Sequence, residues 1–441
     1  MSSIYDIPEI GRGRGASGRL RIPPGVDVPL TPRVRRLVDT AGFRRLAQIS
    51  QLGLVRLVYP AANHTRHEHS LGVFLAAIDY LDHLAADDRF AGIVSAKDAE
   101  LLLAAALLHD IGHWPFGHPI EDIGLAEVPS HEHLAAREIT VGPIAEVLGG
   151  DWGLDPHEVA SLVAGRVKDQ SKRILRSILS GPIDVDKIDY LMRDSLHAGV
   201  PYGQHFDRRR LMSSLCLNEA GDALAVTDKG KTAAEMMVFA RYVMFSEVYW
   251  HHAVRSATAM LQRGFYQLRN DLDINELVTL AEQPFIDRLT IASRGAPAQV
   301  LLEGIFGAER VLYKRLAQYN FVEEPELYRQ LARRPYAELQ SVAGRIADML
   351  STALRDKIEP HEVLVDAPPT QLEVAFNIDV HFAKQNRFRP LGDISPVVRT
   401  LAEEQFDNYV KRVRIFVHPR IADECRELAS LPARLAETLV D

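Results

Sequence analysis

The sequence contains very little cysteine. Only Cys216 and Cys425 occur among the 441 residues, far apart from each other. Two such residues supply neither a disulfide framework nor a thiolate metal site. We therefore expect a protein of a reducing compartment, the cytoplasm, whose stability does not depend on disulfides.

Long apolar runs and an excess of basic residues are also missing. No segment approaches the ~18 to 20 consecutive apolar residues of a membrane span, and the N-terminus MSSIYDIPEIGRGRG lacks the apolar core of a signal peptide. The formal net charge of −8 at pH 7 argues against a protein that coats nucleic acid. We expect no membrane partner, and an anionic substrate would need cations placed locally.

The composition does supply material for a large core. Hydrophobic residues make up 47% and charged residues 25% of the chain, as in ordinary globular proteins. Residues 1–30 are rich in Gly, Arg and Pro without helical or strand periodicity, which predicts a flexible lead-in. We divide the remainder into a domain over residues 31–270 and a C-terminal lobe over residues 271–441.

Helical periodicity dominates the first of these domains. Apolar residues recur at intervals of three and four along one segment, which predicts an amphipathic helix: Leu71, Phe74, Ile78, Leu81 and Leu84. The run from Leu101 to Leu108 is apolar throughout and predicts a buried, central helix. Two short alternating runs predict a β-hairpin near residues 215–228.

The C-terminal lobe combines helical segments with period-two alternation. The alternation covers two stretches, with apolar residues at Leu372, Val374, Phe376 and Ile378 and again at Val413, Ile415 and Val417. HEVLVDAPP is a further short strand-like stretch. The predicted fold class is therefore mainly α, with a helical core and a small mixed α/β C-terminal lobe.

Histidines gather in one part of the chain. Nine of the 17 lie between residues 64 and 133: His64, His67, His69, His83, His109, His113, His118, His131 and His133. Even spacing would place far fewer there. We interpret His64, His83 and His133 as structural histidines.

His109 and Asp110 stand directly after the buried apolar run. Burying a carboxylate without compensation costs several kcal/mol or more, so such a group is normally paired or bound to a metal. A divalent cation removes the conflict. Imidazole with carboxylate suits Mn, Fe, Zn, Co or Ni, and Mg stays an alternative. His69 and Asp186 are the candidates for two further ligands.

The stretch IDVDKIDYLMRD carries six charged residues: Asp184, Asp186, Lys187, Asp189, Arg193 and Asp194. On a helix, Asp186 and Tyr190 share a face with Arg193 or Asp194. Asp189 and Arg193 are expected to pair along the surface, and for Asp189 a solvated position is the plain interpretation.

Four ordered motifs carry a resemblance to a known family. TRHEHSLG, LLHDIGHWPFGH, SHEH and IDVDKIDYLMRD stand in the order of the H…HD…D signature. They resemble the HD phosphohydrolase superfamily, in its branch of deoxynucleoside triphosphate triphosphohydrolases, over roughly residues 31–263. We expect no sterile-alpha-motif domain beside them.

This resemblance implies an α-helical HD core and a role for individual residues. The implied metal ligands are His69, His109, Asp110 and Asp186. The implied catalytic and charge-balancing residues are His113, His118, His131, Asp184, Glu121 and Glu132, with His118 the first choice for proton transfer. The implied substrate contacts are Gln51, Leu52, Arg66, Lys187, Tyr190, Asp194, Arg241, Tyr249 and His251.

The implied reaction is metal-dependent hydrolysis of a deoxynucleoside triphosphate to deoxynucleoside and inorganic triphosphate, by attack of water at the α-phosphorus. The resemblance also implies a homo-oligomer, either a dimer or a tetramer. Arg44 and Ala47 replace the glutamine and arginine of nucleotide-activated members, although Asp39 and Arg45 remain. Nucleotide-driven assembly therefore does not follow from the resemblance.

Two other functions stay open. The first is an HD phosphohydrolase that acts on nucleoside monophosphates, signalling nucleotides or single-stranded nucleic acid. The second is a nucleotide-sensing scaffold without enzymatic activity. The absence of one of the metal ligands would favour this function. All four ligand positions are filled in this sequence.

Overall fold

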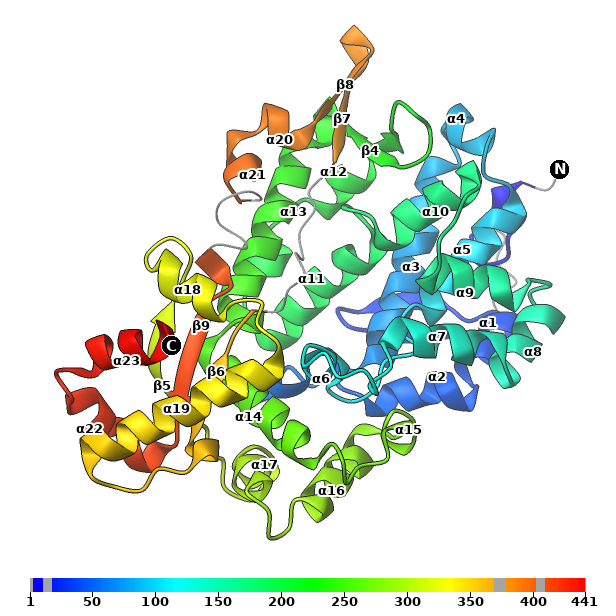
Figure 1. The fold of residues 1–441 in the computed structure, drawn as a ribbon. Helices are drawn as coiled ribbons and strands as arrows, with labels where there is room; N and C mark the ends of the chain where they lie inside the picture. The colour runs from blue at the N-terminus through cyan, green and yellow to red at the C-terminus, as the bar shows by residue number, and fades with distance from the viewer. Residues whose placement is uncertain (1–2, 11–17, 369–377, 402–408, 441) are drawn as a thin grey trace. The chain divides into compact units, whose positions relative to one another are not determined.

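The computed structural model describes residues 3–10, 18–368, 378–401 and 409–440 (Figure 1). This part of the chain is mainly helical, with three small sheets. The prediction of a mainly α protein with small sheets is therefore confirmed. Contacts divide the chain into two compact units. The first comprises Met1–Trp114, Pro129–Met244 and Ala375–Ala402; the second comprises Pro115–Val128, Phe245–Val374 and Glu403–Asp441.

The first unit is built mainly from helices. They are α1 (Pro32–Val38), α2 (Ala41–Arg45), α3 (Arg66–Leu84), α4 (Asp88–Ala91), α5 (Ala96–Leu108), α7 (His131–Thr140), α8 (Pro143–Gly150), α9 (Pro156–Ala164), α10 (Gln170–Ser180), α11 (Val185–Ala198), α12 (Arg208–Met212), α13 (Lys231–Met244), α20 (Leu391–Ile394) and α21 (Pro396–Thr400). Among them, α3 contacts both α5 and α11 (Figure 1).

Helix α5 is the buried central helix that the apolar run predicts. Every residue from Leu101 to Leu108 is buried. Ser95 caps the helix by accepting a hydrogen bond from the backbone N–H of Asp98, whose side chain accepts one in return from the backbone of Ser95. The helix ends at Leu108, and Gly112 and Pro115 follow, residues that do not favour its continuation. His109 and Asp110 therefore lie directly at the C-terminal end of a buried apolar helix.

Two small sheets belong to the first unit. Strands β1 (Arg19–Ile22) and β2 (Val26–Pro29) pair antiparallel. In the second sheet, β3 (Leu215–Leu217) and β4 (Leu224–Thr227) form an antiparallel hairpin in the region where the sequence predicts one. Strand β7 (Asp379–Phe382) pairs parallel with β4 and antiparallel with β8 (Arg387–Pro390). Residues far along the chain therefore complete a sheet of the first unit.

The second unit contains the remaining elements. Its helices are α6 (Gly117–Glu121), α14 (His252–Leu268), α15 (Ile274–Leu277), α16 (Glu282–Ala292), α17 (Ala298–Phe306), α18 (Pro325–Leu331), α19 (Tyr336–Leu354), α22 (Pro419–Glu427) and α23 (Leu431–Val440). Its sheet has the order β5 (Lys314–Tyr319), β9 (Val413–Val417), β6 (Val363–Asp366), and both neighbours pair antiparallel with β9.

The core of the second unit lies between this sheet and its helices. Apolar residues of α19, α22 and α23 pack with those of β6 and β9. The predicted alternation at Val413, Ile415 and Val417 falls on β9, whose residues are all buried. The other predicted alternation begins at Leu372, and its positions up to Phe376 lie outside the described residues.

Within the described ranges, we find no helix with both the length and the apolar character that a bilayer crossing requires.

Candidate metal centre and its surroundings

Three helices place the four candidate metal ligands. His69 lies in the first turn of α3, which Thr65 caps. His109 and Asp110 follow the last residue of α5. Asp186 lies in the first turn of α11, whose capping residue is Asp184. The ligands thus stand at helix ends, where side chains can point toward a common place without interrupting a helix.

These four side chains converge in the structure. The Nε2 atoms of His69 and His109 lie 3.2 Å apart. Asp186 Oδ1 lies 3.0 Å from His69 Nε2 and 3.9 Å from His109 Nε2. Asp110 approaches the same two nitrogens, with Oδ1 at 3.4 Å from His109 and Oδ2 at 4.0 Å from His69. One ion could therefore be reached by all four residues.

The other nitrogen of each imidazole ring faces an oxygen. His109 Nδ1 lies 2.9 Å from the backbone oxygen of Ala106, and His69 Nδ1 lies 2.9 Å from Asp189 Oδ2. An oxygen acceptor at Nδ1 favours the tautomer with the proton on that atom. The lone pairs of both Nε2 atoms then point toward the place where the carboxylates converge. Such a cluster of lone pairs and negative charges favours a bound divalent cation.

Neighbouring charges keep the carboxylates ionised. Burial alone would raise the pKa of Asp110, but His109 and Arg66 hold it well below its usual range. Arg66 Nη1 donates to Asp110 Oδ2 over 2.7 Å. Burial likewise opposes ionisation of Asp186, and its hydrogen bond with His69 lowers its pKa. Both carboxylates are thus prepared to bind a cation.

His69 carries the opposite shift. Burial lowers the pKa of this imidazole, but the hydrogen bonds with Asp186 and Asp189 outweigh burial and raise it to about 10. In the absence of metal the ring therefore retains a second proton between the two carboxylates. A divalent cation would replace that proton, because metal ligands bind in their deprotonated form. The two imidazoles and two carboxylates fit such an ion.

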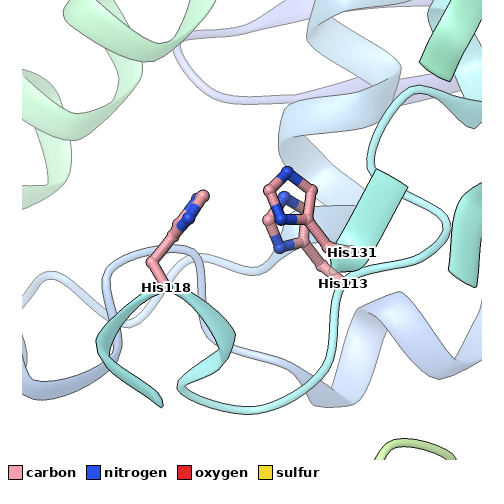
Figure 2. Close-up of side chains that lie close together, drawn as sticks. All are labelled: His113, His118 and His131. Carbon is pink, nitrogen blue, oxygen red and sulfur yellow. The ribbon is translucent and has the colours of Figure 1, made fainter. Parts of the chain in front are cut away.

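Two further histidines lie beside this centre. His113 Nε2 is 3.3 Å from Asp110 Oδ1. The ring of His131, at the start of α7, stacks on that of His113 with centroids 4.0 Å apart and an interplanar angle of 16° (Figure 2). Glu132 Oε1 is 3.4 Å from His131 Nε2. The structure therefore brings together the predicted residues His113, His131 and Glu132.

Lys187 lies on α11 next to the candidate ligand Asp186. Its Nζ donates to Asp184 Oδ2 over 2.6 Å, and its backbone N–H donates to Asp184 Oδ1 over 2.6 Å. Burial raises the pKa of Asp184 to about 7, against the influence of Lys187. Burial lowers the pKa of Lys187, but Asp184 raises it overall, and burial raises the pKa of Tyr190; Arg241 on α13 is close enough to oppose both rises. Lys187 and Arg241 thus supply two positive charges near the start of α11, of which Lys187 is paired with Asp184.

Asp194, at the other end of α11, is held by a histidine. His64 Nε2 lies 2.8 Å from Asp194 Oδ1, and both side chains are buried. The backbone N–H of Gln51 donates to the backbone oxygen of His64 over 2.9 Å. Gln51 Oε1 is buried, and the described residues offer it no hydrogen-bond partner. Leu52 follows at the start of the short 3-10 helix η3 (Gly53–Leu57).

Four predicted residues belong to the second unit. His118 and Glu121 lie on α6, where His118 is exposed. Tyr249 ends the π-helix η6 (Phe245–Tyr249), and His251 caps α14 by accepting a hydrogen bond from the backbone N–H of Ala253. Their assignment to catalysis and substrate contact stays a prediction.

Two residues have contacts that their sequence positions did not predict. His64, interpreted as structural, contacts the predicted substrate residue Asp194. Asp189, expected on a solvated surface, is only 8% exposed and contacts the candidate metal ligand His69. That interpretation of Asp189 was wrong because α3 covers this face of α11. The available signal was its spacing, three residues after Asp186 and four before Arg193.

Comparison with known proteins agrees with these observations. The family model described as HD domain matches residues 66–194, and the model described as HD associated region matches residues 206–432, more than half of the chain. A solved structure of a hypothetical protein from Aquifex aeolicus is 28% identical and superimposes with a TM-score of 0.71, covering 93% of this chain and 98% of that one.

Two curated relatives extend the comparison. An uncharacterized protein of Methanocaldococcus jannaschii is 33% identical over 301 residues, which are 67% of this chain and 59% of the relative. The deoxynucleoside triphosphate triphosphohydrolase SAMHD1 of Gallus gallus is 30% identical over 269 residues, 54% of this chain and 43% of that enzyme. This chain thus spans less than two thirds of either relative. From its motifs, its helical core and the two matching models, the chain belongs to the family of HD-domain proteins with an HD-associated region.

Proposed function

We propose that this protein is a metal-dependent phosphohydrolase that hydrolyses deoxynucleoside triphosphates to deoxynucleoside and inorganic triphosphate. The observation that carries the proposal is the convergence of His69, His109, Asp110 and Asp186 beside the cationic side chains of Arg66 and Lys187. The similarity to a named triphosphohydrolase supports the choice of substrate.

A divalent cation bound by these four residues would polarise a phosphoryl oxygen and lower the pKa of a bound water. In the reaction, water oxygen bonds to the α-phosphorus and the bond from phosphorus to O5′ breaks. O5′ leaves with a proton as the nucleoside hydroxyl, and the triphosphate retains the water oxygen. In this reaction the side chains of the protein must stabilise the negative charge of the transition state and transfer protons.

Charge stabilisation falls to the basic side chains around the centre. A triphosphate is strongly anionic, and its negative charge must be met by fixed cations in the transition state. The protein as a whole is acidic, with a net charge of −8. Arg66 and Lys187 place positive charge locally, and Arg241 adds to it near Lys187 and Tyr190.

Proton transfer and nucleoside recognition fall to other groups. The stacked pair His113 and His131 offers imidazoles within reach of Asp110 and Glu132, and histidine transfers protons near neutral pH. Gln51 has a buried amide oxygen that could accept a hydrogen bond from a base. Asp194, oriented by His64, offers a carboxylate that could accept one from a sugar hydroxyl.

Product analysis tests the proposal. Metal-stripped protein is incubated with Mn²⁺, Mg²⁺ or Co²⁺ and a panel of dNTPs, NTPs, dNMPs and oligonucleotides. We expect deoxynucleoside and inorganic triphosphate in equal amounts from dNTPs. Orthophosphate or pyrophosphate as the product would instead favour a phosphohydrolase acting on other nucleotides.

The variant with both His109→Ala and Asp110→Ala should lose metal and activity together. His133→Ala is the matched control, because His133 is an exposed histidine on α7; it should keep both properties. Nucleotide-dependent function that survives intact in the double variant would contradict catalysis and favour a nucleotide-sensing scaffold.

A further inference from the structure

His69 is held between two carboxylates of the same helix. Asp186 Oδ1 lies 3.0 Å from its Nε2, and Asp189 Oδ2 lies 2.9 Å from its Nδ1. The two ring nitrogens face different directions, so only Asp186 is on the side of His109 and Asp110. Asp189 is on the far side of the ring and is not placed to bind the same ion.

Arg193 holds Asp189 in this position. Its Nε donates to Asp189 Oδ2 and its Nη2 donates to Asp189 Oδ1, each over 2.8 Å. This two-pronged geometry fixes both the position and the plane of a carboxylate. Arg193 is itself only 5% exposed, and its Nη1 donates to Glu68 Oε1 over 2.6 Å and to the backbone oxygen of Pro23 over 3.2 Å. Asp189 is thus anchored independently of any metal.

A glycine on α3 makes room for the pair. A Cβ atom at Gly72 would come within 2.0 Å of Asp189 Oδ1 and 2.3 Å of Arg193 Nη2. Real Cβ atoms do not approach other atoms so closely, so any larger residue would push the pair away. Gly72 is three residues after His69 and therefore lies on the same face of α3.

We infer that Asp189 is a positioning residue for His69. Its carboxylate accepts the Nδ1 proton and so leaves the Nε2 lone pair of the neutral ring for a metal ion. Arg193 orients the carboxylate, and Gly72 provides the space. At the other imidazole, His109, the backbone oxygen of Ala106 accepts the Nδ1 proton. Of the two histidine ligands, His69 is therefore the one whose orientation depends on a side chain.

The inference rests on the metal site of the proposed function but not on its substrate. Removal of such an outer hydrogen-bond partner typically weakens metal binding about 10- to 100-fold. We therefore expect Asp189→Ala to raise the dissociation constant for Mn²⁺ by this factor, measured by titration calorimetry on the metal-stripped full chain. Gly72→Ala, which retains every side chain of the network, should weaken Mn²⁺ binding in the same direction.

Asp79→Asn is the matched control. Asp79 lies on the same helix α3 and pairs with Arg208 over 3.1 Å. Removing the charge of that pair should leave the Mn²⁺ dissociation constant within about twofold of wild type, since the pair includes none of the four candidate ligands. Asp189→Asn is almost the same size as the natural residue and serves if the alanine variant does not fold. Its amide oxygen can replace Asp189 Oδ2, which accepts from both His69 Nδ1 and Arg193 Nε, but its NH2 group would then face the donor Arg193 Nη2, so we expect an intermediate affinity.

The tautomer of His69, that is, which ring nitrogen carries the proton, can be measured directly. General destabilisation of the fold would not change it. In the Zn²⁺-loaded protein with ¹⁵N-labelled histidine, the His69 ring should show its proton on Nδ1, and Asp189→Ala should weaken or shift that signal. If folded Asp189 variants bind Mn²⁺ as tightly as wild type and keep the signal, the inference is overturned. If wild type binds no divalent metal at all, both the inference and the proposed function fail. If wild type binds metal and the Asp189 variants bind it equally well, only the inference fails, so the two failures are distinguishable.

Discussion

Arg66 shows how much a single residue contributes to this site. It is the first residue of α3, three positions before His69, and its guanidinium is buried against Asp110. It thus lowers the pKa of the candidate metal ligand Asp110 and places positive charge beside the proposed position of the triphosphate. One side chain serves both needs because its guanidinium has five donors in a planar fork.

We predict that Arg66→Ala lowers kcat for dNTP hydrolysis by about 10²- to 10³-fold, the usual cost of losing one donor that stabilises transition-state charge. Arg66→Lys should recover part of the loss, since a point charge replaces the fork. Steady-state kinetics with saturating Mn²⁺ measures both. A kcat within threefold of wild type for the alanine variant would show that Arg66 has no part in catalysis.

At the scale of elements, the turn after α5 packs closely against the start of α7. A Cβ atom at Gly112 would come within 2.1 Å of the backbone oxygen of His131 and 2.2 Å of the backbone N of Ala135. Backbone atoms cannot rotate away as a flexible side chain can. This close approach positions His113 for stacking on His131.

We predict that Gly112→Ala separates these elements and destabilises the protein by about 1 to 3 kcal/mol, the range for overpacking in a filled interior. Gly149→Ala is its control: Gly149 lies on α8 with open space around it, and alanine favours helix. Denaturant unfolding measures both. Equal stability of the two variants would show that the turn can move away from α7.

At the scale of the whole molecule, stability should depend jointly on metal and pH. The pKa of His69 is raised to about 10 in the metal-free fold, above the value of ~6.5 for an unfolded histidine. Its protonation therefore stabilises the metal-free fold fully below about pH 6.5, and this contribution is lost as the pH rises toward 10. Metal competes with that proton and binds more readily at higher pH.

We predict that Mn²⁺ raises the melting temperature and does so more at pH 8.5 than at pH 6.5. A concentration 100 times the dissociation constant stabilises the fold by about 2.7 kcal/mol. Thermal unfolding with chelator or with Mn²⁺ at the two pH values measures this. The variant with His109→Ala and Asp110→Ala should show no shift, and an equal shift at both pH values would contradict displacement of a proton.

Much of the fold followed from local patterns. The interval of three and four in LGVFLAAIDYLDHL predicts α3, and the apolar run before His109 predicts the buried α5. The alternation at Val413, Ile415 and Val417 predicts β9. Period and composition act over a few residues, so a single sequence displays them directly.

Contacts between distant segments did not follow in the same way. Strand β7 pairs with β4 more than 150 residues earlier, and Asp189 lies buried against α3 instead of on the surface. The periodicity of apolar residues does not predict which helix will pack against a given face of another helix. The pair of Asp189 with Arg193 was predicted from spacing, but the contacts of Asp189 with His69 and of Asp194 with His64 could be identified only from the tertiary structure.

The sequence by itself determined the helical class, the order of the H…HD…D motifs and the choice of His69, His109, Asp110 and Asp186 as candidate ligands, because residue chemistry and spacing are local properties. Only the tertiary structure decided that their atoms converge and that Asp189, Arg193 and Gly72 support them. That support depends on the packing of one helix against another, a property of distance in space that residue order does not contain.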